Sequence, residues 1–157
     1  MTIEPQHAAV LRGTVADLLA QKGAAVHAIG AQDTVYEAIT RMTQQRVGAL
    51  LVMDGAQLVG IVSERDYTRR VILEGRASKD TPVSTIMTAP VFSVSPASSL
   101  LDCLQLANRH SIRHLPVVQD GAVVGVLSIG DLVRAVVEQQ ADAIARMRSF
   151  IGSDYPN

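Results

Sequence analysis

The first half of the chain combines short apolar runs with segments in which apolar residues recur at helical spacing. Residues Val26–Ile29 form a short apolar run, which is typical of a strand. Val35, Ala38, Ile39 and Met42 then recur at intervals of three and four, which places them on one face of a helix. The pattern therefore predicts a strand followed by a helix with one apolar side.

Two more apolar runs follow this helix. They cover Ala49–Met53 and Leu58–Val62, and the Asp54-Gly55 dipeptide between them favours a tight hairpin because both residues tolerate positive φ. We expect a second helix to begin at Ser63 and to end near Gly75, since glycine commonly follows the last turn of a helix. The predicted order is strand, helix, strand, strand, helix.

The second half of the chain repeats this order. The predicted elements are strands at Val91–Val94, Leu115–Val118 and Val123–Leu127, a helix from Leu100 to about His110, and a last helix that begins at Ser128 and, after Gly130, meets no Gly or Pro before Gly152. The last helix is expected to be longer than its counterpart in the first half.

A seven-residue string makes the repetition explicit. The string at residues 60–66 is Gly-Ile-Val-Ser-Glu-Arg-Asp, and the string at residues 125–131 is Gly-Val-Leu-Ser-Ile-Gly-Asp. Gly60, Ser63 and Asp66 therefore return 65 residues later, and the flanking apolar positions align with the same offset and without a gap. Internal repetition fixes the architecture before local propensity is considered.

The repeats give a domain organisation for the whole chain. A short segment with apolar residues at helical spacing precedes each repeat, at Val15–Leu19 and Val83–Met87, and we expect these lead-ins to tie the two halves together. The predicted parts are an N-terminal extension (1–13), a first repeat with its lead-in (14–75), a linker (76–82), a second repeat (83–140), and a helical extension with a tail (141–157).

The predicted fold class is α/β (α+β), with two β-α-β-β-α repeats. A half-sheet with two helices leaves one apolar face uncovered, so the two half-sheets are expected to pack face to face with pseudo-two-fold symmetry. The first helix of each repeat starts with a capping box, at Thr34-Val-Tyr-Glu37 and Ser99-Leu-Leu-Asp102. We expect ligand clefts between the two repeats.

Composition excludes several classes of function. The 157 residues are 48% hydrophobic, 18% charged and 3% aromatic, with a net charge of −1. This describes a globular chain with neither the positive field nor the aromatic side chains that nucleic-acid binding uses. The longest apolar run, Val47–Met53, is too short to span a bilayer. A single cysteine and the lack of a signal-like N-terminus favour a soluble protein of the cytoplasm.

The Ser63 motif is the first candidate for chemistry. Ser63 stands where a strand turns into a helix, and the helix start favours an anion such as phosphate. Asp66, three residues on, is an acceptor that suits the two hydroxyls of a ribose. The alternative is that Ser63 and Asp66 only cap the helix, because Ser-x-x-acid is itself a capping pattern. One isolated motif favours capping, whereas its recurrence at Ser128 and Asp131 favours a nucleotide.

The two repeats resemble the CBS domain pair, or Bateman module. The resemblance covers residues 14 to about 140 and rests on the paired Gly-x-x-Ser-x-x-Asp strings, the Leu115–Val118 run after Ile112, and the lead-ins at Val15 and Val83. The whole chain is similar to small bacterial signal-transduction proteins that consist of one such pair and little else.

This resemblance implies an adenine nucleotide, such as AMP, ATP, ADP or NAD, in the clefts between the repeats. It implies that Ser63 and Ser128 meet phosphate and that Asp66 and Asp131 meet ribose. The residues that it implies around adenine lead into the second strand of each repeat: Val47, Gly48, Ala49, Ile112, Arg113, His114 and Pro116.

Further polar residues are candidates for the phosphate or the ribose. Arg65, Lys22 and Lys79 could contact a phosphate, and Thr88 could meet the base or the ribose, with Gly23 at the aligned place in the first repeat. Arg65 faces Gly130 in the second motif, so we expect the Ser63 cleft to depend more strongly on ligand charge. An ordinary surface role remains the alternative for each cation.

Other chemistry has weak support in the sequence. His110 and His114 are four residues apart, but the helix is expected to end between them, so no metal is expected. Cys103 falls at an apolar helical position, which indicates a buried small side chain and not a nucleophile. No recognisable catalytic pair is present, and no catalytic residue is assigned.

The leading hypothesis is a non-enzymatic nucleotide sensor. It forms a homodimer, a disc of four CBS repeats as the resemblance suggests, and its signal is read by an effector protein. The alternatives are a constitutive interaction or oligomerisation module without a ligand and a nucleotide-processing enzyme, which lacks a recognisable base and phosphate loop. The sequence leaves open which adenosine ligand binds, how many clefts it occupies, which partner responds, and how the protomers are oriented.

Overall fold

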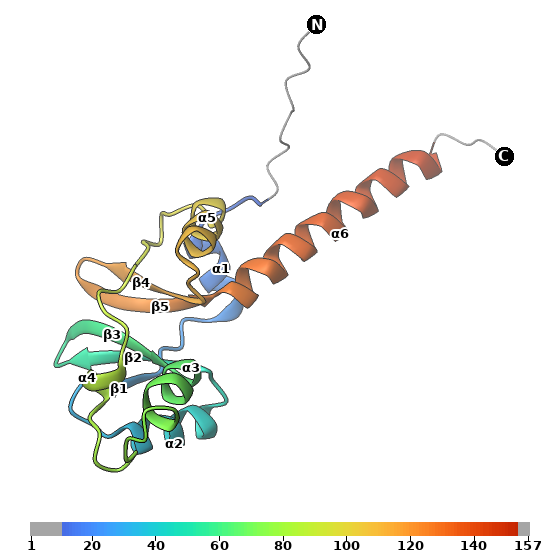
Figure 1. Cartoon of the computed structure of the whole chain (residues 1–157). Coiled ribbons are helices and arrows are strands. Elements are labelled where there is room, and N and C mark those ends of the chain that lie inside the picture. Colours follow the sequence, from blue (N-terminus) through green and yellow to red (C-terminus); the bar gives the residue numbers. More distant parts are fainter. Residues whose placement is uncertain (1–10, 154–157) are drawn as a thin grey trace, which may run out of the picture.

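The computed structural model describes residues 11–153 and contains two similar units stacked on each other (Figure 1). The N-terminal extension and the tail lie largely outside the described residues. The first unit consists of β1 (Ala28–Gly30), α2 (Val35–Gln45), β2 (Ala49–Asp54), β3 (Gln57–Ser63), α3 (Glu64–Tyr67) and η1 (Thr68–Ile72). The second unit consists of α5 (Leu100–His110), β4 (His114–Gln119), β5 (Ala122–Ser128) and α6 (Ile129–Ser153).

The two sheets have matching topology and register. In the first, β1 runs parallel to β2, and β2 pairs with β3 in antiparallel orientation. In the second, β4 and β5 form the equivalent antiparallel pair. The hairpins share a register irregularity, after Val52 in one and after Val117 in the other, and have identical burial patterns. The repeat in the sequence is thus a repeat in the backbone, and the predicted mixed α/β class is confirmed.

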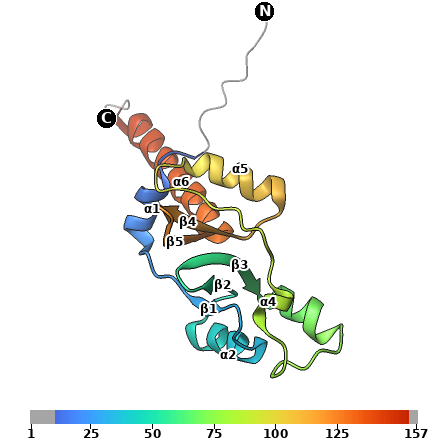
Figure 2. The ribbon, with the colours of Figure 1, turned by 90° about the vertical axis from the view of Figure 1, so that its left-hand side faces the viewer.

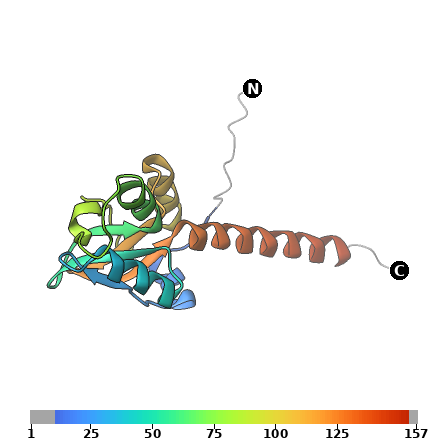
Figure 3. The same ribbon diagram turned by 60° about the horizontal axis from the view of Figure 1, so that its bottom comes forward.

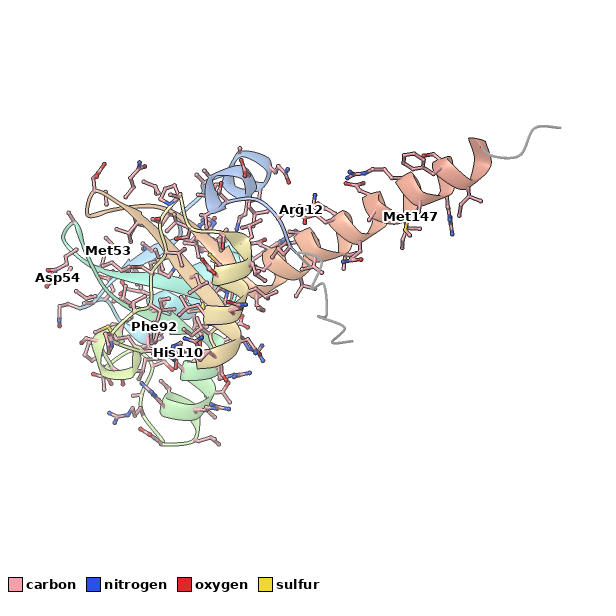
Figure 4. The ribbon with its side chains drawn as sticks, turned by 90° about the horizontal axis from the view of Figure 1, so that it is seen from above. Arg12, Met53, Asp54, Phe92, His110 and Met147 are labelled. Carbon is pink, nitrogen blue, oxygen red and sulfur yellow. The ribbon has the colours of Figure 1, made fainter. Side chains whose placement is uncertain are left out.

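The predicted strand at Val91–Val94 is wrong in its extent. Only Val94 pairs with the sheet, in an isolated parallel bridge to Val117. Its amide donates to the Pro116 carbonyl at 2.9 Å, and its carbonyl accepts from the Val118 amide at 2.8 Å. Residues 91–93 do not enter the ladder, and the exposed Phe92 ring stacks on His110, with 4.3 Å between ring centroids (Figure 4).

The helix predicted from Ser63 to near Gly75 also differs from the expectation. After one turn of α-helix it widens into the π-helical segment η1, in which the Leu73 amide donates to the Thr68 carbonyl five residues back. The Thr68 hydroxyl donates to the Glu64 carbonyl at 3.1 Å, a contact that commonly bends helices. The equivalent helix of the second unit, α6, continues without such a change.

The expected caps are present, with one exception. Thr34 and Glu37 form a complete capping box at the start of α2. At α5 only half of the box forms, since Ser99 accepts from the Asp102 amide at 3.0 Å.

The lead-in helices α1 (Val15–Lys22) and α4 (Val83–Ile86) exchange partners between the units. Val15 and Leu18 of α1 are buried in the core of the second unit, whereas Val83 and Ile86 of α4 are buried in the core of the first. Backbone hydrogen bonds join α1 to Ser98, and α4 to Asp33. Each core therefore contains a segment that precedes the other repeat, which ties the two halves together as expected.

The last helix extends well beyond the two units. Figures 1 and 3 show α6 leaving the side of the β4–β5 sheet and projecting away from the body. Leu132 and Ala135, near its start, belong to the second core. Of the helices that the structure describes between residues 11 and 153, none combines the length and the hydropathy that a membrane span requires.

Candidate functional site

The Ser128 motif lies at the junction of β5 and α6. Asp131 is 8% exposed, and its Oδ2 atom accepts a hydrogen bond from the Ser128 amide at 2.8 Å. In return, the Asp131 amide donates to the Ser128 hydroxyl at 3.1 Å. This exchange satisfies donors at the start of α6 and fixes the direction of the carboxylate.

Two cations hold the Asp131 carboxylate. The Lys22 ammonium, from the end of α1, lies 2.5 Å from Oδ2 and also donates to the Val126 carbonyl at 2.7 Å. The Arg134 guanidinium lies 2.9 Å from Oδ1. Burial acts to raise the pKa of Asp131, but the hydrogen bonds from Lys22 and Ser128, with the charge of Lys22, outweigh it and lower the pKa below its usual value. Asp131 is therefore an anion at neutral pH.

A cavity of about 320 Å³ opens beside this carboxylate. Its walls come from both units and from the end of α1, and Figure 2 shows the two sheets one above the other. The lining residues are Lys22, Gly23, Ala25, His27, Val47, Gly48, Ala49, Leu50, Leu51, Ile61, His114, Val126, Ser128 and Asp131. The volume lies near the lower end of the range of small-molecule sites.

One wall of the cavity is apolar or backbone. It includes Val47, Gly48 and Ala49 at the start of β2, followed by the buried Leu51. Gly48 exposes its backbone, and its carbonyl accepts a hydrogen bond from the Glu64 amide at 3.1 Å. A flat ring could lie against such a wall while the polar groups at the other end hold a more hydrophilic part of the ligand.

His114 adds a titratable ring to the cavity. Burial lowers its pKa, and the charges of Arg113 and Lys22 add to this effect while Asp131 opposes it. The imidazole is therefore neutral at neutral pH, and it offers one donor and one acceptor.

The Ser63 motif has the same local geometry with different surroundings. Asp66 Oδ2 accepts from the Ser63 amide at 2.9 Å and from the Ser63 hydroxyl at 3.0 Å, and the Asp66 amide donates to that hydroxyl at 3.2 Å. The capping interpretation of this motif is therefore confirmed, and capping leaves Asp66 Oδ1 facing Thr88, whose hydroxyl is 3.5 Å away. Asp66 is half-buried.

The predicted site residues thus fall into separate groups. Those that line the cavity are Lys22, Val47, Gly48, Ala49, His114, Ser128 and Asp131. Ser63, Asp66 and Thr88 form the second group described above. Arg65, Ile112 and Arg113 share a shallow hollow beside α5.

Two predicted residues lie elsewhere. Pro116 is buried within β4, where its carbonyl accepts from Val94. The Lys79 ammonium lies over the Tyr36 ring, 4.9 Å from its centroid, and is not among the residues that line the cavity.

The cations gather at a different motif from the one that the sequence favours. The expectation for the Ser63 cleft rested on Arg65 alone, and this exposed side chain extends toward α5 of the other unit. Lys22 and Arg134 instead contact Asp131. Sequence reasoning missed Arg134, although an arginine three residues after an aspartate on a helix is a recognisable ion-pair spacing.

The structure gives a different alignment of the two lead-ins from the one expected from the sequence. Leu19 lies over Gly125 and Met87 lies over Gly60, so these two side chains are equivalent and the offset in the lead-ins is 68 residues. Thr88 accordingly matches Ala20, and not Gly23.

Other reactive groups lie apart from the cavity. Cys103 is buried in the second core, and burial raises the pKa of its thiol to about 11. The side chain is thus a thiol, which is the unreactive form. Within residues 11–153, no group of three or more His, Cys, Asp or Glu side chains is placed to hold a metal ion.

Comparisons with known proteins match both repeats. The sequence model of the CBS domain matches residues 15–72 and 83–138. The CBS domain-containing protein CBSX3, mitochondrial, of Arabidopsis thaliana is 39% identical over 151 residues, which cover 90% of this chain and 73% of that protein.

Solved structures share the fold. A signal-transduction protein with CBS domains from Burkholderia ambifaria is 46% identical, with a TM-score of 0.78 over 82% of this chain and 96% of that one. The hexameric CBS-CP12 protein from bloom-forming cyanobacteria is 28% identical, with a TM-score of 0.64 over 69% of this chain and 64% of that one.

Proposed function

Because the chain belongs to the CBS domain family, as a tandem pair of regulatory CBS domains, we propose that it binds an adenine nucleotide in the cavity beside Asp131 and signals the occupancy to another protein. The proposal includes no reaction. Its site consists of Asp131, Ser128 and Lys22 at the polar end and of residues 47–49 at the apolar end. A cytoplasmic location and a homodimeric disc of four repeats remain predictions that accompany it.

One observation carries this proposal. The cavity joins a buried, ionised carboxylate and a lysine ammonium to an apolar and backbone wall, and these come from three distant parts of the chain. A nucleotide has the complementary arrangement, with a flat base at one end, a diol in the middle and a phosphate at the other end. The volume of about 320 Å³ suits a mononucleotide such as AMP better than a dinucleotide such as NAD.

Each polar residue has a distinct part in the proposed complex. The Asp131 oxygens accept from the two ribose hydroxyls, for which two acceptors on one carboxylate are well spaced. Ser128 and the start of α6 face the phosphate, because open N–H groups and the helix dipole favour an anion there. Lys22 moves from Asp131 to the phosphate, so its charge stays paired in both states.

The lysine provides a route for a signal. Lys22 is the last residue of α1, whose Val15 and Leu18 are packed in the second core. A ligand that draws Lys22 away from Asp131 therefore changes the forces on a helix that belongs to one repeat in sequence and to the other in space. The change in α1 is what an effector protein or a second protomer would detect.

A constitutive interaction module is the second candidate, and one observation favours it. Both Asp131 oxygens already have partners, and every buried side-chain polar atom among residues 11–153 has a hydrogen-bond partner. A protein with such a satisfied site could serve as a scaffold without a ligand. The solved hexameric CBS-CP12 protein supports self-assembly in the family without deciding between the two functions.

Isothermal titration separates the candidates. Adenosine, AMP, ATP and NAD are titrated into the full chain, with GMP as a control for the base, and each mixture is analysed by chromatography for turnover. The nucleotide sensor predicts heat of binding with AMP and an unchanged ligand. If none of the adenine compounds gives heat of binding, the constitutive module is supported. If a nucleotide is converted, the enzyme is supported.

A further inference from the structure

The outer part of α6 has a regular stripe of exposed apolar side chains. Near the body, the Arg12 amide donates to Gln139 Oε1 at 2.8 Å, and Gln139 Nε2 donates back to the Arg12 carbonyl at 2.9 Å. Beyond this contact the helix projects from the body, as the position of Met147 in Figure 4 shows. We call residues 137–153, which run from just before this contact to the end of α6, the stem.

The stripe follows the spacing of a coiled-coil seam. Its apolar members are between 50% and 66% exposed, and successive positions alternate between steps of four and three residues. The positions are Val133, Val137, Gln140, Ile144, Met147 and Ile151. A step pattern of this kind keeps one line of side chains facing a neighbouring helix of the same repeat length.

Charges along the stem change sign. Glu138 and Asp142 lie in its proximal half, whereas Arg146 and Arg148 lie in its distal half. Two stems side by side in antiparallel orientation bring the acidic half of each against the basic half of the other. A parallel pair would place like charges together.

We propose that the stem is a self-association surface, which pairs with the stem of a second copy of this chain in antiparallel orientation. The heptad stripe calls for another helix with the same repeat, and the reversal of charge makes the stem complementary to itself under a two-fold axis. Gln140 is the one polar residue in the stripe, and such a residue favours one register over its alternatives. This interface does not depend on the nucleotide, and it is separate from a disc formed by the repeats.

The first test measures the mass of the full chain in solution over a concentration series. The variant Ile144→Asp/Met147→Asp places two charges in the stripe, and the control Ala145→Asp/Ser149→Asp places two charges on the opposite side of the same turns. We expect the mass of the stripe variant to be half that of the wild type, and the mass of the control to be unchanged. A wild-type mass of 16.7 kDa at every concentration, or equal masses for all three proteins, would overturn the proposal.

Halving is expected whether or not the repeats also form a disc, since the stripe variant takes a dimer to a monomer or a tetramer to a dimer. Circular dichroism of each variant shows whether α6 remains helical. Because the substituted side chains are exposed, we expect the helix signal to be kept.

A second test fixes the orientation. Val137→Cys and Met147→Cys are prepared separately and oxidised alone and as a mixture. In an antiparallel pair two copies of residue 137 are separated by about 15 Å along the axis, too far for a disulfide, whereas residue 137 lies near residue 147 of the second copy. We expect cross-linked dimer only in the mixture. Dimer in each variant alone would contradict antiparallel pairing, and buried Cys103 does not compete.

Discussion

The two Ser-x-x-Asp motifs have the same local geometry and different surroundings. In each motif the serine caps the helix that follows it, and the aspartate in the first turn of that helix accepts from the serine amide. Asp131 is buried, lies in the first turn of a helix of 25 residues and is held by two cations. Asp66 is half-buried, lies in a helix of four residues and faces the hydroxyl of Thr88. The motif thus determines the capping contacts, and the surroundings determine whether cations contact the aspartate.

The lead-in helices explain this difference. The eight residues of α1 reach Lys22, which contacts Asp131. The four residues of α4 end at Ile86, and the backbone of Thr88 then pairs with Ile61 through two hydrogen bonds of 2.8 and 3.0 Å. A difference of one helical turn therefore places a lysine side chain at one site and a paired backbone segment at the other. For this reason we propose the Asp131 site, and not the Asp66 site, for nucleotide binding.

The largest expected effect concerns stability. Asp131→Ala removes a cap worth about 1 kcal/mol and leaves Lys22 and Arg134 without their carboxylate, so we expect a total loss of about 2 to 3 kcal/mol. Asp66→Ala removes its half of a capping box and a 3.5 Å contact with Thr88, with no ion pair among residues 11–153, and is expected to cost about 1 kcal/mol. Urea unfolding measures both. Asp102→Ala is the control, because the amide of Asp102 forms the observed half of its capping box; equal losses at Asp131 and Asp66 would contradict the comparison.

The contacts between lead-ins and sheets provide the second test. A Cβ atom on Gly60 would lie 2.5 Å from Met87 Sδ and 3.1 Å from the Thr88 carbonyl, whereas one on Gly125 would meet Leu19 side-chain atoms at 2.9 Å. Gly60→Ala and Gly125→Ala are each expected to lose about 1 to 3 kcal/mol in urea unfolding.

Double substitutions distinguish the two contacts. Leu19→Ala should recover most of the loss from Gly125→Ala, since only side-chain atoms collide there. Met87→Ala should recover less of the loss from Gly60→Ala, because the Thr88 carbonyl is fixed by its pairing with Ile61. Equal recovery of stability in the two double variants would show that the two lead-ins adjust equally well to the added methyl group.

The third prediction tests the part assigned to Lys22. Without its ammonium, adenosine no longer competes with Lys22 for Asp131 Oδ2, while AMP loses a phosphate contact. Lys22→Met is therefore expected to raise the affinity for adenosine and to lower that for AMP, each by about 1 kcal/mol or roughly fivefold. Titration calorimetry measures both ligands, with Lys79→Met as the matched control. A shift of the same sign for both ligands would remove Lys22 from the proposed exchange.

The smallest effect is the pH dependence from His114. Burial lowers its pKa in the folded protein, so the unfolded chain binds the proton more readily as the pH falls below about 6.5. The melting temperature should therefore decrease between about pH 7.5 and about pH 5.5. His114→Gln should reduce this decrease, and an equal decrease in His114→Gln and the wild type would contradict the assignment to His114. The lowered pKa of Asp131 acts in a separate range, below its ordinary value of 3.8.

The repeats of the fold could be predicted from the sequence because strands, caps and hairpins are set locally. The offset of 65 residues placed the strands Ala49–Asp54 and His114–Gln119 in equivalent positions. The length of the strand at 91–94 was overestimated, since apolar character does not show how many residues of a segment pair with a neighbouring strand. The periodicity of apolar residues likewise did not show that the helix widens from Thr68 to Ile72.

Less of the site could be predicted from the sequence because the site joins residues that are far apart in the chain. Lys22 and Asp131 are 109 residues apart, and their contact follows from the exchange of lead-ins between the cores. Arg65 was favoured because it lies inside the motif, but adjacency in sequence does not determine which way an exposed arginine extends.

The most direct test is a titration of AMP into the wild-type chain, Asp131→Ala and Asp66→Ala under the same conditions. The account predicts that AMP binds the wild type, that Asp131→Ala weakens this binding at least tenfold, or by about 1.4 kcal/mol, and that Asp66→Ala leaves the affinity at the Asp131 cavity unchanged. Binding that survives in Asp131→Ala and disappears in Asp66→Ala would contradict it and assign the nucleotide to the other motif.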